Sequence, residues 1–111
     1  MDHVSAYRDI IKQLLTAYAQ FKPAYGEIDT ELIFDEVRDH YELVHVGWKG
    51  ATRVHGCVIH VDIRQGKVWI QHDGTERGIA EEFVELGIPR EQIVLAFHPP
   101  ELRLHTHFAV A

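Results

Sequence analysis

The chain has 111 residues, of which 46% are hydrophobic and 25% charged, and its formal net charge at pH 7 is −6. These values predict one globular domain over residues 1–111 and argue against a disordered chain. Unaided DNA binding is not expected, because eleven scattered basic residues are outnumbered by seventeen acidic ones. No apolar run approaches the roughly 18 residues that cross a membrane, and the N-terminus does not resemble a secretory signal. We therefore expect a cytoplasmic protein.

An amphipathic helix is predicted near the N-terminus, where apolar residues recur at steps of three and four. Asp2 is a candidate N-cap, and Pro23 and Gly26 interrupt the pattern. The apolar stripe is interpreted as core packing and contains Val4, Tyr7, Ile11, Leu14, Leu15, Tyr18 and Phe21.

Four segments with the composition of β-strands follow the helix: TELIFDEV, HYELVHVGW, ATRVHGCVIHVDI and KVWIQH. Two-residue turns are predicted between them, at Arg38-Asp39, Lys49-Gly50 and Gln65-Gly66. Turns this short join neighbouring antiparallel strands, so the four segments predict a meander.

The last third of the chain predicts a second helix and a returning strand. The segment DGTERGIAEEFVELGIP offers Asp73 or Thr75 as a helix cap and Gly87 as the helix end. IVLAFH at 93–98 predicts a fifth strand, HPP at 98–100 redirects the chain, and the tail is expected to be an edge strand or an arm. The expected fold class is α+β, with both helices packed on one face of the sheet.

The assumed turns place Phe34 opposite Leu43, Leu43 opposite Gly56, and Asp62 opposite Trp69. One face is then strongly apolar and expected to lie under the helices; it contains Ile33, Val37, Val44, Val46, Trp48, His55, Cys57, Ile59, Val61, Ile63, Val68 and Ile70. The other face mixes aromatic, aliphatic and hydrogen-bonding groups; it contains Leu32, Phe34, Tyr41, Leu43, His45, Val54, Val58, His60, Asp62, Trp69 and Gln71. Such a mixture is typical of the buried part of a protein interface.

A protein-binding surface is therefore predicted on the mixed face. Its expected contact residues are His45, His60, Asp62, Trp69 and Gln71. Trp69 would be the anchor, and the polar groups of His60 and Asp62 would fix the register with the partner. A homo-oligomer is also expected, and if this face forms it the same residues would pair across a two-fold axis.

Metal binding or hydrolysis is the alternative interpretation of these histidines. His60 and Asp62 project from one strand to the same side, but zinc needs three or four convergent ligands, and the chain contains neither HExxH nor CxxC. Cys57 and His55 are expected to pack structurally rather than act as a thiol nucleophile. We therefore predict no metal, no other cofactor and no enzyme activity, with a small metal-binding or hydrolytic protein as the alternative.

Several segments resemble the XisI family, whose members are described as fdxN element excision controlling factors. They are LVHVGW, RVHGCVIHVDI, KVWIQHDGTE and IVLAFHPP, preceded by YRDIIKQLLTAYAQFKP. The resemblance implies a controlling role in the programmed excision of a DNA element by a site-specific recombinase. It also implies an XisH-like protein as partner, with the recombinase as a second candidate. It supplies no catalytic residues, and the tail with His105 and His107 fits the family least.

Overall fold

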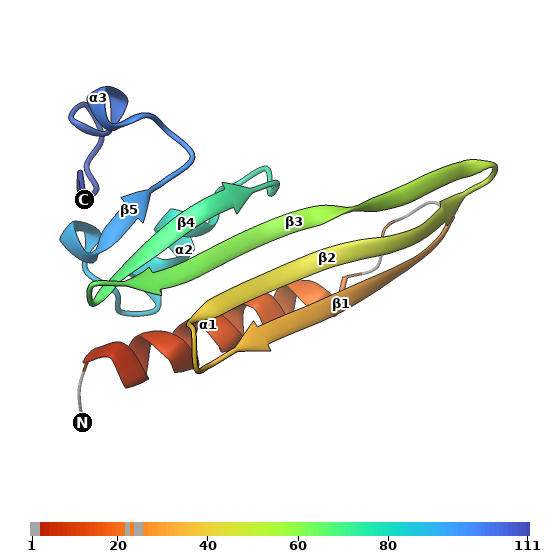
Figure 1. Ribbon diagram of the computed structural model, residues 1–111, viewed down its shortest axis with the longest axis horizontal. Helices are drawn as coiled ribbons and strands as arrows, with labels where there is room; N and C mark the ends of the chain where they lie inside the picture. Colours follow the sequence, from red (N-terminus) through yellow and green to blue (C-terminus); the bar gives the residue numbers. More distant parts are fainter. Residues whose placement is uncertain (1–2, 22, 24–25) are drawn as a thin grey trace.

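The structure is a computed structural model that describes residues 3–21, 23 and 26–111. Its elements, in chain order, are α1 (His3–Ala19), β1 (Glu27–Asp35), β2 (His40–Lys49), β3 (Thr52–Arg64), β4 (Lys67–Asp73), α2 (Ile79–Glu85), a 3-10 turn (Arg90–Gln92), β5 (Ile93–Leu95) and α3 (Pro100–Arg103) (Figure 1). The strands form one open sheet in the order β1-β2-β3-β4-β5. Strands β1 to β4 are antiparallel, and β5 runs parallel to β4. The predicted α+β class and the meander are confirmed.

The helices form where the sequence pattern places them. In α1 the residues Tyr7, Ile11, Leu14 and Leu15 are buried, whereas Phe21 lies beyond the helix and is 74% exposed. The proposed cap Asp2 lies outside the described residues.

Both candidate caps of the second helix bind its N-terminal backbone. The backbone N–H of Ile79 donates to Asp73 Oδ2 at 2.8 Å, and the N–H of Gly78 donates to the Thr75 hydroxyl at 3.2 Å. Gly87 follows the helix with a φ of 113°, a conformation that favours glycine. The cap residues and the glycine identified in the sequence therefore marked the two ends of α2 correctly.

The fifth strand is shorter than expected, because the segment after Leu95 turns away from the sheet. Pro100 then begins the four-residue α3. The tail returns only as an isolated parallel bridge between Val94 and Ala109, so it forms neither an extended edge strand nor a free arm.

Two of the three predicted turns differ from the structure. Asp35 pairs with His40 and Lys49 pairs with Thr52, so the first loop has four residues, 36–39, and the second is Gly50-Ala51. Phe34 therefore faces Tyr41 rather than Leu43. The third turn is confirmed, with positive φ at both Gln65 and Gly66.

A β-bulge at Val58 overturns the predicted division of residues between the two faces. Val44 pairs with Cys57, but the preceding Leu43 pairs with Ile59, which leaves Val58 as the extra residue on β3. Leu43 therefore shares a face with Ile59 instead of opposing Gly56. Because side chains alternate, one extra residue exchanges the faces of the strand beyond it.

The helix-covered face is therefore assembled from both predicted sets. It contains Leu32, Phe34, Tyr41 and Leu43 from β1 and β2, together with Ile59, Val61, Ile63, Val68 and Ile70 from β3 and β4. The helices α1 and α2 pack against it through residues such as Ile11 and Phe83. Several residues expected under the helices lie on the opposite face instead: Ile33, Val44, Val46, Trp48, His55 and Cys57. Val37 lies in the first loop and is 90% exposed.

The loop 36–39 is held against α1 by a bidentate ion pair. Arg8 donates to Asp39 Oδ1 at 2.7 Å and to Oδ2 at 3.1 Å, and the Tyr41 hydroxyl also donates to Oδ1. The backbone carbonyl of Asp39 accepts the N–H of Ile63, which ties the loop to β3. The Arg8 guanidinium holds the pKa of the Asp39 carboxyl below its usual value.

Replacing Arg8 with alanine is expected to lower the melting temperature, because it leaves the Asp39 carboxylate without its charged partner beside the core. Arg38→Ala is the matched control, since Arg38 pairs with Asp35 through a side chain that is 75% exposed. Thermal unfolding followed by circular dichroism compares the two variants. Equal melting temperatures would show that the Arg8 contact adds nothing to stability.

Among the described residues, no helix is both long enough and apolar enough to cross a lipid bilayer.

Candidate functional site on the open face of the sheet

The surface of the sheet opposite α1 and α2 is called the open face below. Strand pairing places on it Glu27, Asp29, Glu31, Ile33, Asp35, His40, Glu42, Val44, Val46, Trp48, Arg53, His55, Cys57, His60, Asp62, Arg64, Lys67, Trp69, Gln71 and His72. Apolar groups occupy its middle, carboxylates follow the edge strand β1, and a polar cluster lies towards β4. The exposed fractions of Ile33 and Trp48 are 49% and 51%, which is high for large hydrophobic residues.

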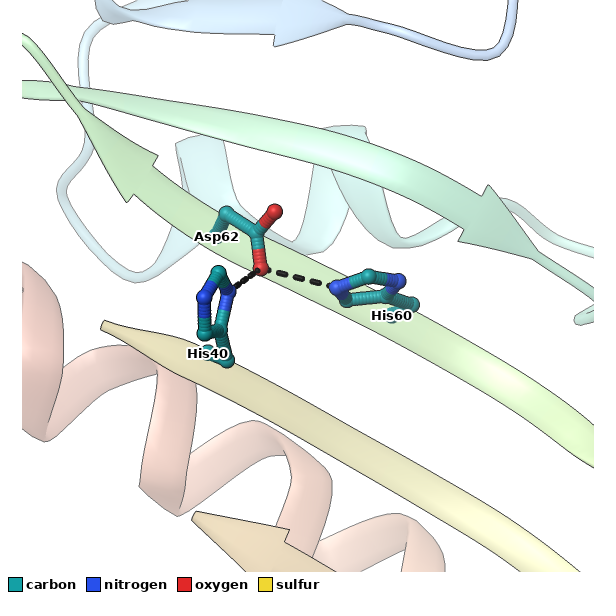
Figure 2. Close-up of side chains that lie close together, drawn as sticks. All are labelled: His40, His60 and Asp62. Carbon is teal, nitrogen blue, oxygen red and sulfur yellow. Dashed lines mark hydrogen bonds and ion pairs between the residues drawn. The ribbon is translucent and has the colours of Figure 1, made fainter. Parts of the chain in front are cut away.

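Asp62 is the centre of the polar cluster. Its Oδ1 atom lies 2.8 Å from His40 Nδ1 and 2.8 Å from His60 Nε2, and the two imidazole rings approach it from different sides (Figure 2). Asp62 is only 6% exposed and is the one charged side chain that is buried among the described residues. A carboxylate this buried needs hydrogen-bond partners, and the two histidines provide them.

Strand pairing places the three groups together. His60 and Asp62 are two residues apart on β3, so their side chains project to the same side. His40 is the first residue of β2 and pairs directly with Asp62. The neighbouring Asp39 is fixed by Arg8 of α1, so the helix also holds the start of β2 in position.

Two further side chains orient the cluster. Gln71 donates its amide N–H to Asp62 Oδ2 at 3.3 Å, and the bulge that it forms in β4 turns it towards Asp62. Glu42 Oε1 lies 3.8 Å from His60 Nδ1, on the opposite side of the ring from Asp62. Each end of the His60 imidazole therefore faces a carboxylate.

The hydrogen bond with Asp62 raises the pKa of His40 above its usual value. The His40 side chain is 52% exposed, whereas that of His60 is 31% exposed. The cluster can therefore be reached from solvent through His40 even though the carboxylate is buried.

Four of the five predicted contact residues lie together on the open face. His60, Asp62 and Gln71 are joined by hydrogen bonds, and Trp69 pairs with Asp62 across β3 and β4. His45 does not join them, because it lies on the same side of β2 as the buried Leu43.

Trp69 is partly buried by contacts within the chain. Its indole N–H donates to the carbonyl of Arg64, and the guanidinium groups of Arg64 and Arg103 lie 4.9 and 5.7 Å from the ring centroid. The sequence predicted Trp69 to be the exposed anchor of the surface, but Trp48 presents more area. Only Arg53 is seen above the Trp48 ring among the described residues, at 5.2 Å.

His40 and Trp48 were not among the contact residues predicted from the sequence. The predicted turn at Lys49-Gly50 placed His40 opposite Ile59 on the covered face, whereas the observed turn at Gly50-Ala51 and the bulge at Val58 pair His40 with Asp62. Trp48 was assigned to the covered face by the register that ignored the bulge. The strand composition of HYELVHVGW contained the signal for His40, but its partner across the sheet depended on a bulge that composition does not reveal.

Cys57 behaves as a structural residue of the open face. Burial is the largest cause that raises the pKa of its thiol, and the nearby carboxylate of Glu42 adds to the effect. The thiol donates to the carbonyl of Ile59 at 3.2 Å. A raised pKa disfavours the thiolate, so the geometry does not support a cysteine nucleophile. His55 is exposed and does not lie in the core, where it was expected.

Comparison with known proteins gives the family context of this site. The XisI protein family model matches residues 1–110. The chain belongs to the XisI family. No curated protein is similar enough to this chain to be identified as a relative.

Two solved structures from Anabaena variabilis ATCC 29413 are similar to this XisI-family chain over its whole length. One is a XisI-like protein with 43% sequence identity and a TM-score of 0.90. The other is the fdxN element excision controlling factor XisI, with 35% identity and a TM-score of 0.85. Each comparison covers 99% of this chain and 100% of the other.

Proposed function

We propose that this XisI-family protein is a controlling factor in the excision of a DNA element, and that it acts by binding other proteins rather than by catalysis. Its full-length similarity to a solved fdxN element excision controlling factor supports the process. The open face supports binding to proteins as the mode of action, because it combines the exposed apolar side chains of Ile33 and Trp48 with a separate polar cluster.

The chemistry of the open face favours a partner with basic groups around an apolar contact. Glu27, Asp29 and Glu31 are exposed and project from the edge strand onto this face. The chain as a whole carries a formal charge of −6. Complementary charge speeds association and selects the partner. An XisH-like protein is the proposed first partner, and a site-specific recombinase is the second.

Within the surface, Ile33 and Trp48 would provide the buried contact. His60, Asp62 and Gln71 would form its polar end, with Trp69 beside them; the sequence had assigned the role of anchor to Trp69. The formal net charge of −6 does not favour direct DNA binding. The protein would therefore affect recombination through its partner proteins.

Affinity measurements with a purified XisH-like protein test the proposal. Trp48→Ala is expected to raise Kd by at least about 30-fold, because truncating an aromatic anchor of a protein interface costs roughly 2 kcal/mol or more. Binding should also weaken as salt is added, since the carboxylates of β1 lie at the rim.

Val37→Ala is the matched control, because Val37 is an exposed aliphatic residue in the loop between β1 and β2. This variant should bind like the wild type. Unchanged binding by Trp48→Ala would contradict the proposal. So would a result in which Trp48→Ala converts a homodimer to a monomer and leaves partner binding intact, because the open face would then serve self-association.

A further inference from the structure

We propose that His40, His60 and Asp62 form a binding site for one divalent transition-metal ion, with Zn²⁺ as the reference ion. The proposed function does not require this ion, so the two proposals stand or fall separately. The ligand atoms would be His40 Nδ1, His60 Nε2 and a carboxylate oxygen of Asp62, and these atoms all lie within 4.8 Å of one another (Figure 2).

The donor set fits such an ion. Two imidazole nitrogens and one carboxylate oxygen are ligands that Zn²⁺ and related divalent transition metals accept. Mg²⁺ and Ca²⁺ prefer oxygen ligands alone, so these ions should bind much more weakly. Three protein ligands leave coordination positions for water or for a side chain of a partner.

The backbone presents the three ligands from two adjacent strands in the middle of the sheet. His40 and Asp62 are direct cross-strand partners, and His60 is two residues from Asp62 on β3. The strand β2 begins beside the Arg8–Asp39 ion pair, which limits movement of the His40 backbone. Folding of the sheet therefore already accounts for most of the conformational entropy that is lost in bringing the three ligands together.

The surrounding groups match those that support metal ligands in proteins. A metal-binding histidine commonly directs its second nitrogen towards a carboxylate, and Glu42 lies 3.8 Å from that nitrogen of His60. Gln71 donates to Asp62 Oδ2, which leaves Oδ1 directed at the two histidines. Both outer contacts come from residues that the strand pairing already places on the open face.

Ion binding requires only small side-chain rotations. In a tetrahedral site, metal–ligand bonds of about 2.0–2.2 Å place any two ligand atoms about 3.3–3.6 Å apart. The two nitrogen–oxygen pairs, now 2.8 Å apart, must therefore open, and the two imidazole nitrogens, which lie within 4.8 Å of each other, can adjust to this separation by rotation of the rings. His40 is half exposed and free to make that adjustment, and the ion would replace the two hydrogen bonds now made to Asp62 Oδ1.

The competing explanation is that the histidines only satisfy the buried carboxylate of Asp62. Isothermal titration of tag-free, chelator-treated protein with ZnCl₂ separates the two. The metal site predicts saturation at one ion per chain and a rise in melting temperature with added Zn²⁺, because the ion binds the folded state. A purely hydrogen-bonded cluster predicts neither.

Single substitutions locate the ion. His40→Ala and the isosteric Asp62→Asn are each expected to weaken binding by more than about tenfold, and Glu42→Gln by about tenfold, because it removes only the outer contact. Melting curves without metal verify that each variant is folded. Since His40 and Glu42 are not buried, those two variants report on the site even if Asp62→Asn unfolds.

His55→Ala is the matched control, because His55 is an exposed histidine of β3 on the same face but outside the cluster. It should bind Zn²⁺ like the wild type. Absence of saturable binding, or equal weakening in His40→Ala and His55→Ala, would overturn the proposal and assign any affinity to scattered surface histidines.

Discussion

Replacing Phe83 with alanine is expected to lower the free energy of unfolding by about 3–5 kcal/mol. Phe83 is fully buried and, with Ile79, anchors α2 in the core. Its removal loses the transfer free energy of the ring and leaves a cavity in the core cluster that also contains Ile59, Ile70 and Ile88. Domains of this size are stable by only about 5–15 kcal/mol, so a large part of the stability would be lost.

Urea unfolding followed by tryptophan fluorescence measures the effect of Phe83→Ala. Leu86→Ala is the control, because Leu86 lies one residue beyond α2 and is 37% exposed. Leu86→Ala should lower the free energy of unfolding by well under half as much as Phe83→Ala. Comparable midpoints for the two variants would show that α2 is not packed as described.

Gly47→Ala is expected to have the largest effect of any methyl addition in the sheet. A Cβ atom at Gly47 would lie 2.1 Å from the carbonyl oxygen of Glu27 and 2.7 Å from the Cα atom of Ile28. Both are backbone atoms of β1, which cannot rotate away as a side chain can. The edge strand must shift, at a cost of at least about 1–3 kcal/mol.

Gly56→Ala is the matched control for Gly47→Ala. Gly56 lies on the adjacent strand β3 and pairs with His45, and a Cβ atom there meets nothing within 4 Å. Alanine is usually no worse than glycine within a strand, so this variant should be neutral or slightly stabilising. Hydrogen exchange should show faster opening of β1 in Gly47→Ala alone. Equal exchange in both variants would contradict the close approach of the two strands.

The sequence was a good guide to the elements and a poor guide to their register. The 3.6-residue period of α1, the cap residues before α2, and the Gln65-Gly66 turn are local signals, and the structure confirms each. The bulge at Val58 has no comparable signal, because valine at that position is also typical of a regular strand. One extra residue then assigned Leu43 and Cys57 to the wrong sides of the sheet.

The candidate site was predictable to the extent that it lies within a single strand. His60 and Asp62 share a side of β3 for any register, and Trp69 faces Asp62 because the intervening turn was identified correctly. His40 enters through pairing between β2 and β3, which depends on the Gly50-Ala51 turn and the bulge at Val58. His45 was assigned to the surface for the same reason. Contacts between strands, unlike those within one, required coordinates.

The bulge also divides the long hairpin of β2 and β3 into two segments that differ in how well they tolerate side-chain substitutions. On the helix-proximal side, alternate positions are fixed by contact with α1 and α2. Residues 52–57 belong to the segment that extends past the end of α1 (Figure 1). Because none of residues 52–57 is buried, side chains in this tip can be exchanged without altering which residues form the core. The tip is therefore the part of the molecule in which specificity can diverge while the domain continues to fold.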